Sequence, residues 1–130
     1  MTDYKSRLKE IFSEVLENPL YQEELIKKHF SPDYVQYVDG KTLYFEEFNQ
    51  HMKVLKKDMP EIKIDVLTLV QEDHTVFSNH LVSGTTKEER KGLVQVIGEF
   101  RFSGNRLCYC NELTCLLSGD PKDRDLGSRV

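Results

Sequence analysis

Apolar residues recur at helical spacing in the first half of the chain and at strand spacing in the second half. Residues 3–17 place an apolar residue at every third or fourth position, which predicts an amphipathic helix. A second helix is expected over 19–30, with Asn18 as its N-cap. The clearest pattern is that of residues 43–59, where a narrow apolar stripe indicates a helix that packs on a core and ends at Pro60.

Four later segments are rich in β-branched and aromatic residues, and each is predicted to be a strand. They cover residues 62–71, 75–86, 92–103 and 106–117. Short connections join them, so the sheet should be mainly antiparallel, and a shorter strand is expected at 34–38. Helices followed by a run of strands predict an α+β fold, with a curved sheet that encloses a pocket at one end.

Composition and charge narrow the classes of function. The chain has 130 residues, the size of one domain, and its 38% hydrophobic and 31% charged residues fit a globular protein. The net charge of −4 argues against nucleic-acid binding, and no apolar run reaches the roughly 20 residues of a membrane span. We expect one domain over 1–118 and a charged tail over 119–130, which is either mobile or ordered by a partner subunit.

The three cysteines, Cys108, Cys110 and Cys115, lie in the last strand segment. Their number is odd and the first residues lack the apolar segment of a signal peptide, so we expect reduced thiols in a cytoplasmic protein. Their spacing along a strand does not match the tight loops of zinc sites. With no nucleotide-binding or HExxH motif in the chain, the sequence predicts neither a metal nor a cofactor.

The Gly104-Asn105 turn sets the predicted register of the last two strands. A two-residue turn pairs residues whose numbers sum to 209. Because side chains alternate along a strand, this register turns Tyr109 and Asn111 toward the core and Cys110 and Glu112 away from it. A shift of one residue would exchange the two faces, so Glu112 is retained as an alternative acid–base residue.

Two histidines are the candidate proton carriers, because imidazole titrates near neutral pH. His51 lies at the edge of the apolar stripe of the 43–59 helix, whereas periodicity leaves the direction of His80 open. The candidate ligand-binding residues are Tyr34, Tyr37, Tyr109 and Asn111. Each of these side chains also has a purely structural explanation, as a packed or hydrogen-bonded core residue. The remaining histidines, His29 and His74, are expected in solvent.

Residues 3–117 resemble the SnoaL-like branch of the nuclear transport factor 2-like superfamily. The matching features, in order, are the paired N-terminal helices, YVQYVDG, the helix with Phe45, Phe48 and Leu55, Pro60 before IKIDVLTLV, HLVSGT, and the hairpin FRFSGNRL. The resemblance implies a cone: a curved, mainly antiparallel sheet wrapped around N-terminal helices, as in a cystatin-like α+β roll. It also implies a ligand pocket and a homodimer formed through the outer face of the sheet.

The resemblance leaves the reaction open, because the superfamily includes polyketide cyclases, steroid isomerases, dehydratases and non-enzymatic binding proteins. Isomerase relatives place a carboxylate base near the position of Val38, and cyclase relatives use an inward carboxylate late in the sheet, where this chain has Glu99 and Glu112. One hypothesis is cofactor-free acid–base chemistry on a small apolar molecule, such as isomerisation, cyclisation or hydration. The alternative is a non-catalytic, dimeric binding or interaction module.

Overall fold

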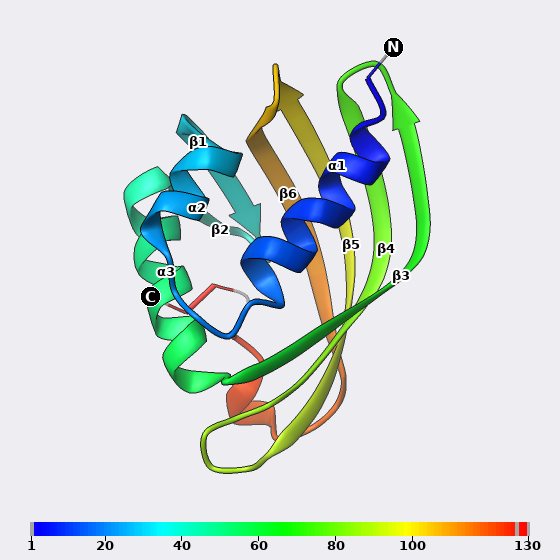
Figure 1. Cartoon of the computed structure of the whole chain (residues 1–130). Helices are drawn as coiled ribbons and strands as arrows, with labels where there is room; N and C mark the ends of the chain where they lie inside the picture. Colours follow the sequence, from blue (N-terminus) through cyan, green and yellow to red (C-terminus); the bar gives the residue numbers. More distant parts are fainter. Residues whose placement is uncertain (1, 127, 130) are drawn as a thin grey trace.

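The computed structural model describes residues 2–126, 128 and 129. Within this part of the chain, three α-helices pack on one six-stranded sheet (Figure 1). The helices are α1 (Tyr4–Ile11), which continues as the π-helical turn η1 (Phe12–Leu16), α2 (Glu23–His29) and α3 (Phe45–Asp58). None of the helices described is long and apolar enough to cross a membrane.

The sheet has the strand order β2-β1-β6-β5-β4-β3, and only β1 and β6 run parallel. The strands are β1 (Phe30–Val38), β2 (Lys41–Tyr44), β3 (Glu61–Glu72), β4 (Thr75–Thr85), β5 (Lys91–Ser103) and β6 (Arg106–Ser118). The predicted α+β fold with a mainly antiparallel sheet is confirmed. Strand β2 was not predicted, because four residues are too few to show a period.

The second helix begins later than the sequence predicts. Asn18 does not cap it; its side-chain oxygen accepts a hydrogen bond from the backbone N–H of Leu20 at 3.0 Å and closes a local turn. The helix starts at Glu23, and the segment that follows it, expected to be a helix end, is already part of β1. The local hydrogen bond of the asparagine side chain therefore delays the helix by one turn.

The sheet curves strongly around the first helix, as Figure 1 shows. Leu8 and Ile11 of α1 are fully buried against it. At the other end of the sheet, the rings of Phe30, Tyr34 and Phe48 pack with centroid separations of 4.6 to 4.9 Å and join α3 to β1. Aromatic packing at one edge, and mixed aliphatic and aromatic packing at the other, where Tyr4 stacks on Phe102 at 4.7 Å, hold the helices over the concave face and produce the expected cone.

A β-bulge at Cys108 breaks the predicted register of the last hairpin. The pairs next to the turn are as expected as far as Leu107, but Cys108 has no partner in the pairing of β5 with β6. From Tyr109 to Leu116 the pairs are shifted by one residue, so that Glu112 and not Asn111 lies opposite Gly98, and a second shift follows between Val94 and Leu93. The register predicted from the turn is therefore wrong for most of β6.

The shift exchanges the two faces of β6. Cys110 is fully buried and Glu112 lies on the inner face, whereas Asn111 is exposed on the outer face and Tyr109 is half-buried there. The prediction that Tyr109 and Asn111 face the core is wrong. Turn geometry fixes the pairs beside a turn, and an extra residue farther along the strand resets all later pairs.

Candidate functional site

A cavity of about 160 Å³ lies between the inner face of the sheet and the helices. Most of its wall is apolar and comes from α1, η1, α3 and strands β3 to β6. The polar side chains in the wall are few: those central to the site are Tyr34, Gln36, His51, His80, Glu112 and Thr114. Such a cavity, apolar with a few convergent polar groups, is typical of a small-molecule site.

Glu112 is the acidic group on the sheet floor of this cavity. Burial is the main reason that the pKa of its carboxyl group is raised to about 7, and the nearby negative charge of Asp39 raises it further. Interaction with the Cys110 thiol acts in the opposite direction. Among the described residues, no cationic side chain forms an ion pair with Glu112. The carboxyl group is therefore able to gain or lose a proton near neutral pH.

Gly98 on β5 makes room for this glutamate. A Cβ atom at Gly98 would lie 3.1 Å from Cγ of Glu112 and 3.0 Å from Cε2 of Phe100. Both distances are tighter than normal carbon contacts, so a side chain at this position would push the glutamate or the ring aside. The glycine and the bulge together allow a carboxyl group on a floor that is otherwise packed with apolar side chains.

His80 on β4 supplies a neutral imidazole to the same cavity. Its Nδ1 lies 2.8 Å from Oγ of Ser78, and its ring packs against those of Phe12 and Phe100. Burial lowers its pKa to about 4, so the ring is uncharged at neutral pH. When the Ser78 hydroxyl donates to Nδ1, the ring proton lies on Nε2, which is then a hydrogen-bond donor.

His51 on α3 is also buried and lines the cavity. Its Nδ1 lies 2.7 Å from the backbone oxygen of Arg129. Because a carbonyl oxygen only accepts, the proton is on Nδ1, and Nε2 carries the lone pair. Burial is the main cause that lowers the pKa of this imidazole, and the charge of Lys56 adds to it. His51 therefore presents a neutral ring with one accepting nitrogen.

Tyr34 and Gln36 come from β1 and complete the polar part of the wall. The hydroxyl group of Tyr34 donates to Oε1 of Gln36 at 2.7 Å, and both side chains are buried. Burial raises the pKa of Tyr34 well above its ordinary value, so the phenol stays neutral. Gln36 was missed by the sequence analysis, although its position two residues after Tyr34 on one strand would have placed it on the same face.

The structure divides the predicted site residues into two groups. Those at the cavity are Tyr34, His51, His80 and Glu112, whereas Tyr37, Tyr109 and Asn111 lie on the outer face of the sheet. On that face the rings of Tyr37 and Tyr109 lie 5.7 Å apart, and the Arg101 guanidinium sits 4.2 Å above the ring of Tyr109. The second group therefore cannot touch a molecule inside the cone in this arrangement.

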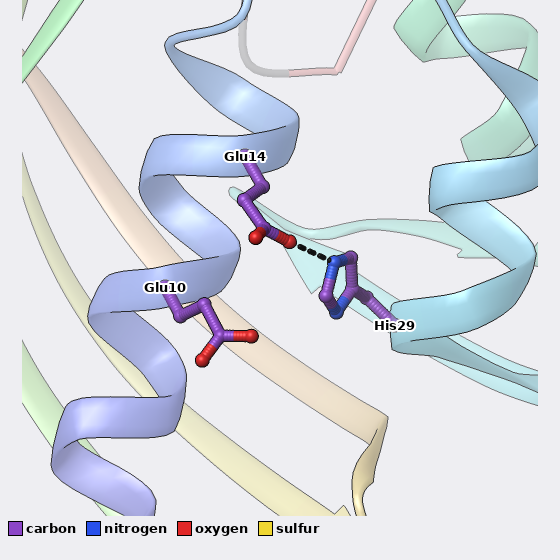
Figure 2. Close-up of side chains that lie close together, drawn as sticks. All are labelled: Glu10, Glu14 and His29. Atoms are coloured by element: carbon purple, nitrogen blue, oxygen red, sulfur yellow. Dashed lines mark hydrogen bonds and ion pairs between the residues drawn. The ribbon is translucent and has the colours of Figure 1, made fainter.

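A second group of polar side chains lies outside the cavity, between α1 and α2. Figure 2 shows Glu10, Glu14 and His29, whose ligand atoms lie within 4.8 Å of one another. His29 is fully buried, so the expectation that it lies in solvent is wrong. Its Nε2 is 2.6 Å from a carboxylate oxygen of Glu14, the contact drawn as a dashed line in Figure 2.

Arg7 determines which nitrogen of His29 carries the proton, and so whether this group can bind a metal. A guanidinium nitrogen of Arg7 lies 2.8 Å from Nδ1 of His29, and arginine only donates, so Nδ1 is the acceptor. The imidazole proton must then be on Nε2, where it bonds to Glu14 and leaves no lone pair for a metal. The same guanidinium bonds the backbone oxygen of Asn105. The group is therefore a hydrogen-bonded link between α1, α2 and the tip of the last hairpin.

Comparison with known proteins gives a relative by sequence and several by fold. No protein-family model matches the chain. The uncharacterized protein C11D3.04c of Schizosaccharomyces pombe is 30% identical over 105 residues, which make up 81% of each chain. The chain belongs to the same family as this yeast protein.

Several solved structures with the same fold are named as enzymes. One, provisionally assigned as a polyketide cyclase from Acidithiobacillus ferrooxidans, superposes with a TM-score of 0.74 over 96% of this chain and 93% of its own, at 20% identity. An epoxide hydrolase of the LEH-like type from M. tuberculosis gives 0.69 over 94% and 86%, at 13% identity. The fold is thus that of the SnoaL-like branch of the nuclear transport factor 2-like superfamily.

The raised pKa of Glu112 predicts how this residue affects stability. The native pKa of about 7 lies above the ordinary value of 4.5, so the native state holds the proton more tightly than the unfolded state. The resulting stabilisation is complete below pH 4.5 and is lost as the pH rises through 7. A shift of this size corresponds to about 3 kcal/mol. Glu112→Gln should therefore gain about 3 kcal/mol relative to wild type between pH 4.5 and 8.

Urea unfolding of both proteins across this pH range measures the difference. His80, with its lowered pKa, loses stability as the pH falls, but this contribution cancels when the variant is compared with wild type. Glu99→Gln, on the outer face, is the control and should follow the wild-type curve. A constant difference between Glu112→Gln and wild type at all pH values would show that Glu112 does not titrate near neutrality.

Proposed function

We propose that this protein binds a small, mostly apolar molecule inside the cone and exchanges a proton with it through Glu112. The observation that carries the proposal is the carboxyl group of Glu112 on the floor of an apolar cavity, where burial raises its pKa to about 7. A general acid–base group works best when its pKa is close to the ambient pH, and such tuning by burial is common at active sites. The enzyme names of proteins with this fold agree with the proposal.

The proposed step needs no cofactor. The Glu112 carboxylate removes a proton from a carbon next to a carbonyl group, and the electron pair of the broken C–H bond forms the enolate. The carboxylic acid then returns the proton to the same or another carbon, so the reaction is a proton transfer without oxidation. His80, neutral at this pH, donates through Nε2 to the enolate oxygen, and Nε2 of His51 accepts from a hydroxyl group of the bound molecule.

The size of the cavity limits the molecule. An apolar cavity of about 150 Å³ holds benzene in another protein, so a cavity of similar volume holds one six-membered ring. Cyclohexanone is a suitable probe, because it combines such a ring with one carbonyl group and acidic protons beside it.

Cyclohexanone should bind to the wild-type protein at pH 7 with the uptake of less than half a proton, and the fraction of Glu112 that stays ionised is the base of the proposed step. Glu112 is about half ionised at this pH, and a bound apolar molecule that excludes water favours its neutral form. Calorimetry in two buffers with different ionisation enthalpies measures the uptake. In D₂O, the protein should also accelerate exchange of the protons beside the carbonyl, and Glu112→Gln should slow this exchange about a hundredfold.

Glu99→Gln provides the matched control, because it changes the same functional group on the outer face of the sheet. It should retain both proton uptake and exchange. Binding without accelerated exchange would make the protein a binding module and contradict the proposed chemistry. No binding of cyclohexanone, or equal proton uptake in wild type and Glu112→Gln, would contradict the role of the cavity or of Glu112.

We further propose a homodimer formed through the outer sheet face, which we define by Phe77, Ile97, Leu113 and Leu117. These four apolar side chains are exposed on β4, β5 and β6, with Leu113 at 68% of its maximal exposure. The outer face of β3 to β6 covers roughly 800 Å², from the strand spacing and the rise per residue. Each partner of a stable dimer buries about the same area.

Leu113→Lys should convert the dimer into a monomer, because it places a charge at the centre of the buried face on each partner. Light scattering after size-exclusion chromatography measures the mass. Leu20→Lys is the control, since Leu20 is as exposed as Leu113 but lies in the segment before α2. A wild-type mass equal to one chain, or a dimer that persists in Leu113→Lys, would contradict this interface.

A further inference from the structure

The C-terminal strap, which we define as residues 119–126, 128 and 129, closes one end of the cavity. Gly119, Asp120, Asp123, Arg124 and Leu126 all contribute to the wall. Figure 1 shows this red segment running from the end of β6 toward α3. The strap is therefore part of the candidate site, although it adds no strand and no α-helix to the fold.

Gly119 directs the chain from the sheet into the strap. Its φ is +132°, a conformation that glycine adopts readily. A Cβ atom at this position would lie 3.1 Å from Cα of Gly92 and 3.2 Å from the backbone oxygen of Lys91. The strap thus starts tightly packed against β5. A short 3₁₀ turn (Pro121–Asp123) follows, and the backbone N–H of Lys122 donates to the side chain of Asp120 at 3.0 Å.

Two ion pairs attach the strap to the mouth of the cone. Arg90, in the β4–β5 connection, holds both carboxylate oxygens of Asp123 at 2.9 and 3.0 Å. Asp123 is only 8% exposed, so this carboxylate depends on its partner. At the other end of the strap, Arg129 bonds Asp58 of α3 at 3.2 Å. Both pairs keep some access to water, and pairs of this kind open more easily than packed apolar contacts.

The strap also reaches the chemistry of the cavity. The backbone oxygen of Arg129 accepts the hydrogen bond from Nδ1 of His51, and this contact fixes the proton on Nδ1. Displacement of the strap would remove this acceptor and free the imidazole to carry its proton on either nitrogen. Closure of the cavity and the protonation geometry of His51 are therefore coupled by a single hydrogen bond.

We propose that the C-terminal strap is a lid: it leaves the mouth of the cone to admit a ligand, and its return encloses the ligand and sets the tautomer of His51. Arg90 is the latch and the Arg129 carbonyl is the positioning group. This inference rests on the proposed function, because a lid matters only if the cavity binds a molecule. It also predicts that a molecule larger than one ring enters no faster than the strap opens.

The fluorescent dye 1-N-phenylnaphthylamine tests the lid, because it is neutral, apolar and larger than the closed cavity. In stopped-flow experiments with wild-type protein, the association rate should level off at high dye concentration, at the rate of strap opening. Arg90→Gln leaves Asp123 without its partner and should raise this limiting rate about tenfold, the effect of losing one charge-assisted bidentate contact. Arg90 itself does not line the cavity, so the cavity wall is unchanged.

Arg101→Gln is the matched control, because it breaks an ion pair with Glu99 at 2.6 Å on the outer face. It should leave the limiting rate unchanged. The ¹⁵N shifts of His51 give a second readout: they should report the Nδ1–H tautomer in wild type and a mixture in Arg90→Gln. If the limiting rate is equal in wild type and Arg90→Gln, or is raised equally in Arg90→Gln and Arg101→Gln, the strap is not a lid, and the proposed function is unaffected. If the dye binds none of the three proteins while cyclohexanone still binds, the lid is contradicted and the proposed function stands; if cyclohexanone does not bind either, the proposed function is contradicted as well.

Discussion

The β-bulge at Cys108 is the feature on which the candidate site depends. An extra residue in β6 shifts its pairing with β5 by one position, and the shift turns Glu112 from the outer face to the cavity. Without the bulge, the inner face would carry the amide of Asn111 at this place, and the cavity would have no acid on its sheet floor. One backbone irregularity therefore decides whether the sheet floor of the cavity carries a titratable carboxyl group.

The environment of Glu112 explains both its acid–base chemistry and its destabilising effect on the native state at high pH. The apolar wall that excludes water raises the pKa of the carboxyl group and destabilises its ionised form in the native state. The same wall lowers the pKa of His80 and keeps its imidazole neutral. One cavity thus moves the pKa of an acid and of a base in opposite directions, which is the arrangement that acid–base chemistry at neutral pH requires. Stability at high pH is reduced as a result.

Much of the fold, but only part of the site, follows from the sequence. The apolar stripe of α3 and the alternation of apolar and polar residues along the strands predict the helix layer and the sheet layer. A buried apolar face repeats every 3.6 residues in a helix and every two residues in a strand. His51 could be placed at the cavity because it lies at the edge of the apolar stripe of its helix. Of the two tyrosines predicted at the pocket from β1, strand alternation lets only one face inward, and the structure shows that it is Tyr34. Asn111 could not, because turn chemistry fixes only the nearest pairs and the bulge at Cys108 leaves no trace in the hydrophobic pattern.

Tertiary contacts account for the other differences between the sequence-based predictions and the structure. His29 looks like a solvent-exposed helix end in the sequence, yet Arg7 and Glu14 satisfy both of its nitrogens and allow it to be buried. The charged tail looks mobile or bound to a partner, whereas Asp123 and Arg129 find counter-ions in distant parts of the same chain. Contacts of this kind join residues far apart in sequence, and local patterns carry no information about them.

A direct titration of the Glu112 carboxyl group tests the inward-facing acid most sharply. Protein with ¹³C-labelled glutamate, compared with Glu112→Gln to assign the signal, reports the chemical shift of this carboxyl carbon from pH 3 to 9. Burial of Glu112 on the cavity floor predicts a midpoint near pH 7. A midpoint near the ordinary value of 4.5 would show that Glu112 is solvated and would contradict the site.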